Sequence, residues 1–331
     1  MFNTLVFNKD IYYGKGRVFT LVFLSLLFSG FSSCDFQKSK KKKIESKEGK
    51  ESHFAYDLKN PDKNFDLPAS LNEISGISYY DKNKIVCVQD EKAVIYFFDT
   101  KKGKVIKKYD FGEDADFEDI SVVGDNAYAL RSDGTLFKIR DFQKNQKKTI
   151  KINTSLDGKN NTEGLAFDRE SNSLLIACKD SPSINEEELH GGFNAIYRFD
   201  LKNEKLIEKP EYLLDFKIVD KIRFKGSIEK IFVEAARKLN LTEDETSFHP
   251  SGIAINPLET EKIYMISGVE KLMIVMDKDG MILDIIDLDS RIFNQPEGIC
   301  FSNDGDLFIS NEGENGDENI LKFKPEKGSF K

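Results

Sequence analysis

The chain has 331 residues and a formal net charge of −8 at pH 7. Residues 1–52 contain ten Lys and Arg against five Asp and Glu, so the +5 of this segment leaves −13 for the rest of the chain. A region this acidic is a poor nucleic-acid binder, and we expect no nucleic-acid partner. Its length is sufficient for one large hydrophobic core or two modest ones.

Residues 1–33 have the features of a lipoprotein signal peptide. Lys15 and Arg17 precede an apolar run over residues 18–28, which is too short to span a bilayer. The sequence "FSSC" follows and resembles the lipobox of bacterial lipoproteins, with Cys34 as the residue that carries the lipid. A cleaved secretory signal with an incidental cysteine is the alternative. Both interpretations place the mature protein outside the cytoplasm, and the first anchors it to a membrane of a bacterial cell envelope through Cys34.

Residues 34–53 include the run "KSKKKKIESKEGKE", which has almost nothing to bury and predicts a Lys-rich, solvated tether. Such a tether could contact anionic lipid head groups, or it could be a plain spacer. The folded domain then comprises residues 54–331.

One short motif recurs along this domain as "NEISGIS", "ADFEDIS", "NTEGLAF", "HPSGIAI" and "QPEGICF". The steps between corresponding positions are 43, 45, 88 and 46, so the long step is close to two periods. The corresponding positions are Gly76, Asp119, Gly164, Gly252 and Gly298. After each motif come two or three further short apolar strands broken by Asp, Asn and Gly turns.

Four-stranded units at this period predict a β-propeller, in which each sheet buries its faces against its neighbours around a ring. A β-sandwich has no reason to repeat one motif at a fixed period. Within the long step, apolar residues recur at helical spacing over residues 226–239, which indicates an amphipathic helix and not a missing blade. We therefore predict an all-β fold, a five-bladed β-propeller of four-stranded blades with one inserted amphipathic helix.

The fifth unit lacks a full outer strand. The segment "FAYDLKNPDKNFDLP", which precedes the first motif, can supply that strand and close the ring. Three cysteines remain besides Cys34, and each lies within an apolar strand, so we expect buried small side chains and no disulfide framework. These three are Cys87, Cys178 and Cys300.

The residues that enter each innermost strand are polar. Because alternate residues on a strand share a face, two rings are predicted around the channel. The outer ring contains Glu73, Asp116, Asn161, His249 and Gln295, and the deeper ring contains Ser75, Glu118, Glu163, Ser251 and Glu297. We expect these side chains to face a water-accessible channel. The Gly that follows in four motifs permits close backbone approach or a bulge.

Three carboxylates on one axis, Glu118, Glu163 and Glu297, would repel one another unless some are protonated or a cation binds. Oxygen ligands with few His favour a hard ion such as Ca²⁺. Side chains that merely hydrogen-bond neighbouring blades are the alternative.

The loops after the second and fourth strands of each unit share the face on which the inner strands begin. The insertion "KDSPSINEEELHGGF" and the predicted helix both arise there, so they could form a lid over a polar funnel or pack on its rim. Polar residues at the ends of second strands are expected to rim this face: Asp90, Glu91, Asp133, Asp180, Asn311 and Glu312.

The motifs "EISGI", "DFEDI", "TEGLAF", "PSGIAI" and "PEGICF", in this order, resemble the SdiA-regulated family of bacterial envelope proteins. The resemblance covers about residues 54–326 and implies a five-bladed propeller with a Ca²⁺ site, contacts with other proteins and no established catalytic activity. Its motif acids fall on Glu73, Glu118, Glu163 and Glu297. Asp119 in place of Gly, His249 and the inserted helix depart from its pattern.

We therefore expect a lipid-anchored module that binds a protein or small ligand at the propeller mouth. The alternative is a Ca²⁺-dependent hydrolase of lactones or esters, in which His249 is the imidazole placed to act as general base. A purely structural propeller is the third possibility. No G-x-S-x-G or H-E-x-x-H motif supports an enzyme, and neither the ligand nor the partner can be named from the sequence.

Overall fold

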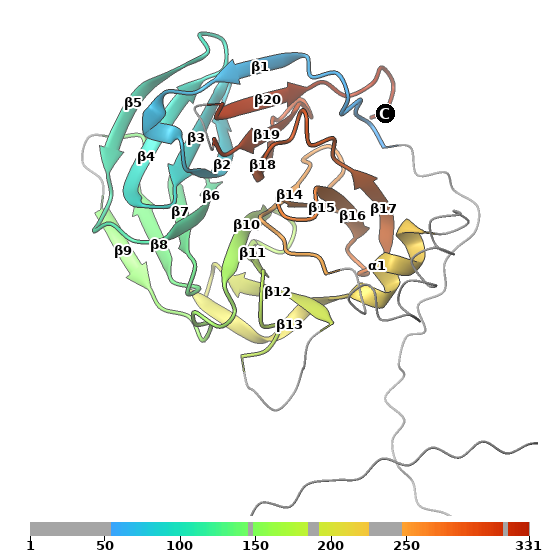
Figure 1. The fold of residues 1–331 in the computed structure, drawn as a ribbon. Coiled ribbons are helices and arrows are strands. Elements are labelled where there is room, and N and C mark those ends of the chain that lie inside the picture. Colours follow the sequence, from blue (N-terminus) through green and yellow to red (C-terminus); the bar gives the residue numbers. More distant parts are fainter. Residues whose placement is uncertain (1–53, 145–147, 185–191, 225–246, 314–316, 331) are drawn as a thin grey trace, which may run out of the picture. The chain divides into compact units, whose positions relative to one another are not determined.

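The computed structural model describes residues 54–144, 148–184, 192–224, 247–313 and 317–330. The predicted signal peptide, the Lys-rich tether, Cys34 and the predicted helix over residues 226–239 lie outside these ranges. Figure 1 shows the described chain as a ring of blades.

The strands form five four-stranded sheets, which confirms the predicted propeller. The first blade contains β2 (Ile74–Asp81), β3 (Lys84–Gln89), β4 (Lys92–Asp99) and β5 (Lys104–Asp110). The second contains β6 (Phe117–Val123), β7 (Asn126–Arg131), β8 (Leu136–Arg140) and β9 (Lys148–Ile152). The third contains β10 (Thr162–Asp168), β11 (Ser173–Cys178), β12 (Phe193–Asp200) and β13 (Lys205–Asp215). The fourth contains β14 (Gly252–Ile255), β15 (Lys262–Ser267), β16 (Leu272–Asp277) and β17 (Ile282–Asp287).

The fifth blade joins the two ends of the described chain. It contains β18 (Pro296–Phe301), β19 (Leu307–Asn311), β20 (Asn319–Phe323) and, as its outer strand, β1 (Lys63–Asp66). β1 pairs antiparallel with β20, with Lys63 opposite Lys322, and the two strands lie side by side in Figure 1. The backbone N–H of Leu67 extends the ladder by donating to the carbonyl of Glu318 at 3.0 Å. This pairing confirms the predicted closure of the ring.

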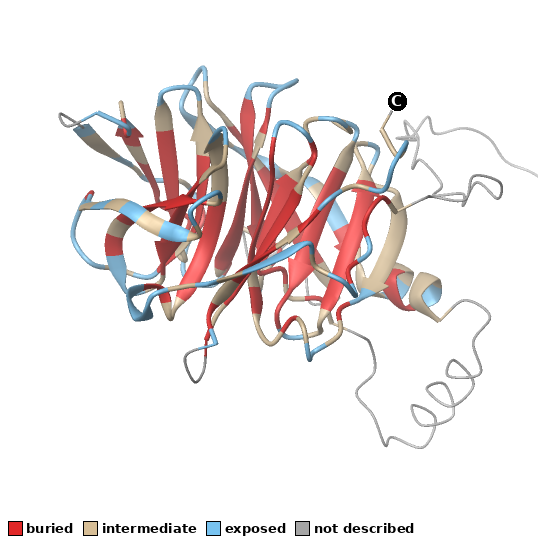
Figure 2. Ribbon diagram, turned by 90° about the horizontal axis from the view of Figure 1, so that it is seen from above, coloured by how far each residue is buried: buried red, intermediate tan, exposed pale blue. Residues whose placement is uncertain are grey.

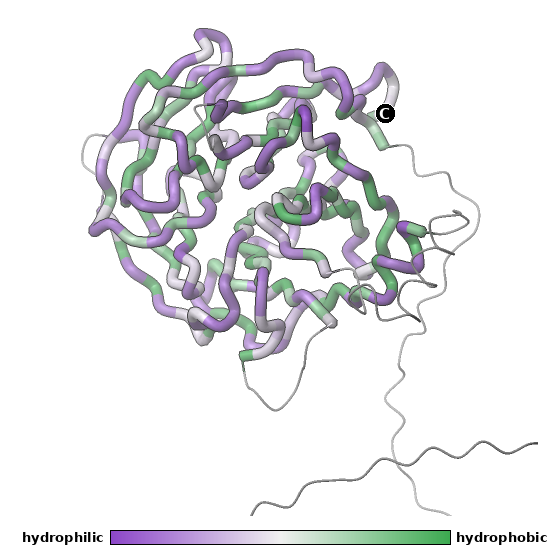
Figure 3. The backbone as a smooth tube through the Cα atoms, viewed as in Figure 1, coloured by the Kyte–Doolittle hydropathy of each residue, from purple (hydrophilic) through white to green (hydrophobic). Residues whose placement is uncertain are grey.

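Burial falls from the inner strands to the outer strand of a blade (Figure 2). Every residue of β11 is buried, because this strand has a neighbour on each side and a blade over each face. β5 instead alternates between exposed and partly buried residues, as expected of an outer strand with one wet face. Hydrophobic segments accordingly lie within the blades and hydrophilic ones in many of the connecting loops (Figure 3). Cys87, Cys178 and Cys300 are buried free thiols, as predicted.

The recurring Gly marks where inner strands of adjacent blades nearly touch. A Cβ on Gly76 would lie 2.3 Å from Asp119 Oδ1, and one on Gly252 would lie 2.5 Å from the carbonyl oxygen of Glu297. The strand register also shifts at this motif in four of the five inner strands, which marks a bulge. Both expected uses of the Gly, close approach and a bulge, are therefore present.

Asp119 replaces this Gly in the second blade and bonds across the seam to the third. Its Oδ2 accepts from the backbone N–H of Leu165 at 2.6 Å, and its Oδ1 accepts from the N–H of Ile120 at 2.7 Å. Burial raises the pKa of Asp119 well above its usual range. In the second blade, the inner strand is thus joined to that of the third blade by hydrogen bonds of the Asp119 side chain, where the other blades have a Gly that allows the backbones to approach closely.

A helix that was not predicted follows the outer strand of the third blade. α1 (Phe216–Arg223) begins after Asp215, whose side chain accepts from the N–H of Lys217 at 2.9 Å. Its Val219 is buried in the core shared by the third and fourth blades. A further short element is the 3-10 turn η1 (Ala69–Leu71). Within the described ranges, no helix has both the length and the apolar character needed to cross a membrane.

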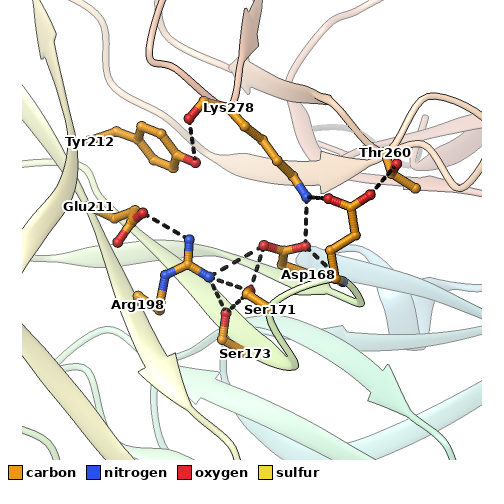
Figure 4. Close-up of polar contacts among 9 residues, drawn as sticks. Asp168, Ser171, Ser173, Arg198, Glu211, Tyr212, Thr260 and Lys278 are labelled. Atoms are coloured by element: carbon orange, nitrogen blue, oxygen red, sulfur yellow. Dashed lines mark hydrogen bonds and ion pairs between the residues drawn. The ribbon is translucent and has the colours of Figure 1, made fainter.

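Charged residues on the face where the inner strands end join the third and fourth blades (Figure 4). Buried Asp168 lies 2.9 Å from Lys278 Nζ and 3.4 Å from an Arg198 nitrogen. Lys278 also contacts Glu170 at 2.6 Å, and Arg198 contacts Glu211 at 3.0 Å. We refer to these five residues as the blade clamp.

Candidate functional site

The five inner strands β2, β6, β10, β14 and β18 contact one another in turn around the channel. They begin on the same face, which we call the mouth. The predicted rings lie at these strand starts. In the deeper ring Ser75, Glu163 and Ser251 are buried, and in the outer ring Asp116 is exposed. The remaining ring residues are partly buried.

Lys179 lies among the carboxylates of the deeper ring. It follows directly after β11, and its Nζ lies 2.8 Å from Glu163 Oε1. The Glu163 side chain is only 9% exposed, so this ion pair is largely shielded from water. Burial disfavours the Lys179 ammonium, but the charges of Glu163 and Glu297 outweigh that effect and raise its pKa. The sequence did not identify this residue as part of the site.

The carboxylates of the deeper ring have raised pKa values. Burial raises the pKa of Glu118 to about 10, with a further contribution from Glu163 and Asp116. Burial and Glu163 raise the pKa of Glu297 to about 7, although Lys179 opposes them. The pKa of Glu163 is raised by burial more than Lys179 lowers it. The repulsion expected of these acids is therefore relieved in two ways, by protonation and by an internal cation.

A second acidic group surrounds Glu312 at the end of the fifth blade's second strand. Its carboxylate accepts from Gln295 Nε2 and shares a hydrogen bond with Glu73. Burial raises the pKa of Glu312 to about 8, whereas the hydrogen bond from Glu312 lowers the pKa of Glu73. A protonated Glu312 thus donates to an ionised Glu73. Nearby, burial and the charge of Glu73 raise the pKa of Asp90 to about 6.

His249 pairs with Glu270, a second residue that the sequence did not identify. His249 Nδ1 lies 2.6 Å from Glu270 Oε1, and the backbone N–H of His249 donates to Oε2 at 2.9 Å. Ser267 also donates to this carboxylate. Burial raises the pKa of Glu270, but these hydrogen bonds prevail and lower it. Nε2 of His249 makes no hydrogen bond with any residue of the described chain.

Several ring and rim residues have structural roles. Ser251 Oγ donates to the carbonyl of Pro296 in the next blade at 2.7 Å. Asn161 adopts a left-handed backbone with φ of 47°, and its carbonyl accepts from the N–H of Lys179 at 2.8 Å. Asp133 pairs with Arg131 at 2.5 Å, and Asn311 is buried and donates to the side chain of Asn319 at 2.9 Å. Of these contacts, the one made by Ser251 links neighbouring blades, and the others lie within a single blade.

Within the described ranges, two of the four predicted Ca²⁺ ligands are engaged in other contacts. Carboxylate oxygens suit Ca²⁺ chemically. However, no three His, Cys, Asp or Glu residues of the described ranges are grouped so as to hold a metal ion. Glu73 bonds to Glu312 and not to the deeper ring, and Glu163 is already paired with Lys179. We derive no step through Ca²⁺, which remains a prediction from the sequence.

Comparison with known proteins identifies the repeat. A family model described as SdiA-regulated matches residues 61–216, which span the first three blades. Residues 61–216 thus match the SdiA-regulated family. The fourth and fifth blades continue the same strand order beyond the matched segment. No curated protein matches the chain.

Solved structures similar to this chain include propeller-like enzymes of low sequence identity. The glutaminyl cyclase of Myxococcus xanthus has a TM-score of 0.54 at 11% identity, covering 81% of this chain and 96% of that chain. The PQQ-bound aldose sugar dehydrogenase of Streptomyces coelicolor has a TM-score of 0.47 at 13% identity, covering 81% and 98%. At 11% identity, the likeness to the glutaminyl cyclase shows the fold alone.

Proposed function

We propose that this chain is a lipid-anchored, extracytoplasmic propeller whose mouth binds a positively charged group of a protein or small ligand. The single observation that supports this function most is the acidic mouth. Carboxylates with raised pKa values gather there, and groups of this kind are concentrated at functional sites. The acids with raised pKa values are Asp90, Glu118, Glu163, Glu297 and Glu312. Glu73 and the exposed Asp116 belong to the same mouth.

The deeper ring and the outer acids of the mouth differ in how their negative charge is balanced. The deeper ring is neutralised from within, by the Lys179 ammonium and by the proton on Glu118. The outer acids, among them exposed Asp116, have no such internal cation among the interactions described above. An incoming ammonium or guanidinium group would therefore interact first with the outer acids, in an environment where Coulomb attraction is only partly screened.

The experiment is fluorescence anisotropy with a labelled hexalysine peptide, using a hexaglutamate peptide as the charge control. We expect saturable binding of hexalysine that weakens as salt is added. Asp116→Asn should lower the affinity by about 2–5-fold, the range of a single exposed charge pair. The matched control is Asp125→Asn, which makes the same change at an exposed site beyond the other end of β6. Equal effects of the two substitutions would contradict the proposal.

The anchor is tested separately. Cells expressing the chain would be labelled with radioactive palmitate, with Cys34→Ala as the matched variant. We expect label and membrane association in the wild type and loss of both in the variant. A labelled variant would rule out Cys34 as the lipidated residue.

Hydrolysis of esters or lactones is the second candidate function, and the His249–Glu270 pair favours it. The carboxylate at Nδ1 fixes the tautomer in which Nε2 can accept a proton from water. His249→Ala and Glu270→Gln should then reduce turnover of an aryl ester or lactone, the first more than the second. If the wild type turns over neither substrate, or if His249→Ala leaves turnover unchanged, this candidate fails and the pair has the structural role of holding the chain that enters β14.

A further inference from the structure

Lys179 is held in place by backbone contacts on both sides of its side chain. Its N–H donates to the carbonyl of Asn161 at 2.8 Å, and its carbonyl accepts from Asn194 Nδ2 at 3.1 Å. Asn194 is buried, so this anchor is fixed by packing. The side chain is therefore directed from a rigid strand end toward Glu163, where the ion pair forms at 2.8 Å.

The Lys179 ammonium interacts with all three carboxylates of the deeper ring. Glu163 is its direct partner, and the charges of Glu297 and Glu118 also act on it. The same three acids are the ones that the sequence predicts as ligands of a divalent ion. A Ca²⁺ ion needs oxygen ligands at about 2.3–2.6 Å. Glu163 cannot approach Ca²⁺ in this way while its carboxylate faces an ammonium, and the two cations would repel each other.

We propose that Lys179 is the resident cation of the channel, an internal ammonium that takes the place of a divalent metal ion and excludes it. The mouth then remains assembled without metal, and its deeper ring is closed to Ca²⁺. This inference does not depend on the proposed function, because it concerns the deeper ring and not the ligand of the outer acids.

The inference is tested by thermal unfolding of the full chain after chelation, with and without added Ca²⁺, and by Tb³⁺ luminescence as a direct reading of ion binding. The wild type should show no Ca²⁺-dependent rise in Tm. Lys179→Gln removes the charge and should create a Ca²⁺-dependent rise of about 2–4 °C, accompanied by Tb³⁺ luminescence. Adding Glu163→Gln to that variant should abolish both signals.

Two further variants show whether the gained response is specific. Lys179→Arg retains a cation and should behave as the wild type does. Lys322→Gln is the matched control, because the Lys322 side chain is 18% exposed and pairs with Asp306 at 2.6 Å from β20, which is not an inner strand. This variant should not respond to Ca²⁺.

The proposal is overturned if the wild type itself gains stability with Ca²⁺ and Glu163→Gln abolishes that gain. It is also overturned if Lys179→Gln is folded by circular dichroism yet binds neither Ca²⁺ nor Tb³⁺. If Lys179→Gln does not fold, the wild type and Lys179→Arg decide: Tb³⁺ luminescence that depends on Glu163 in either protein overturns the proposal, and its absence from both supports it.

Discussion

At the face where the inner strands end, Asp168 is buried between Lys278 and Arg198, whereas at the mouth Glu118 is surrounded by other acids and has one ammonium nearby. Burial alone would raise the pKa of both carboxyls. In the blade clamp, hydrogen bonds from Ser171 and Lys278 overcome burial and lower the pKa of Asp168. At the mouth nothing overcomes it, and the pKa of Glu118 rises to about 10.

These two carboxylates therefore have opposite effects on folding. A lowered pKa means that Asp168 stabilises the fold above the ordinary pKa of Asp and loses that contribution as the pH falls through its folded value. A raised pKa means the reverse for Glu118. The folded state binds its proton more tightly than the unfolded state, so stability decreases as the pH rises from the ordinary Glu value toward about 10. At neutral pH the ionised Asp168 of the blade clamp stabilises the folded state, whereas the buried Glu118 of the mouth lowers its stability.

Breaking the clamp should give the largest effect. Asp168→Asn removes the charge that Lys278 and Arg198 share and leaves two partly buried cations without their central partner. We expect a loss of about 2–4 kcal/mol in the free energy of unfolding at neutral pH, measured by urea denaturation. The loss should shrink in acid, where the wild-type carboxylate is also protonated. An equal loss at every pH would show that the clamp acts by packing alone.

Removing an acid from the mouth should have the opposite sign. Glu118→Gln keeps the shape and the hydrogen-bonding capacity of a protonated Glu but cannot ionise. We expect the variant to be more stable than the wild type, on the order of 1–2 kcal/mol at about pH 9, with a smaller difference at about pH 6. Urea denaturation at both pH values measures it. A destabilised variant at the higher pH would mean that ionised Glu118 has a favourable partner.

The smallest effect is expected at the edge of the clamp. Glu170 also contacts Lys278, but its side chain is 48% exposed, so solvent screens the pair. Glu170→Gln should therefore cost far less stability than Asp168→Asn in the same urea denaturation. This variant serves as the control for Asp168→Asn, since both lose one negative charge beside the same lysine. A loss as large as that of Asp168→Asn would remove the distinction between buried and exposed partners.

The features that could be predicted from the sequence are those with a local pattern. Strand alternation, turn residues and the repeated Gly determined the number of blades, the bulges and the strand that closes the ring. The polar entry to each inner strand likewise predicted that Glu118, Glu163 and Glu297 would share one environment. These features can be predicted because the period-two alternation of apolar and polar residues shows which face of a strand is buried.

The partners of these side chains could not be predicted, because they are distant in the sequence. Lys179 follows a buried strand, and a lysine at such a position usually faces solvent. No local pattern indicates that its side chain pairs with Glu163, 16 positions earlier. The blade clamp joins Asp168 to Lys278 across 110 positions. α1 has only 8 residues, too few for a distinct helical period to stand out beside a strand. The inserted helix over residues 226–239, the anchor at Cys34 and the Ca²⁺ site stay predictions.

The pairing of β1 with β20 affects how the chain is made. A ribosome releases β1 first and β20 last among the described strands, with more than 250 positions between Lys63 and Lys322. Until β20 emerges, β1 has no partner and the growing ring has open edges, which are the surfaces on which strands of different molecules associate. A nascent chain therefore has unpaired strand edges through most of its synthesis, and a truncation before β20 leaves β1 without its partner.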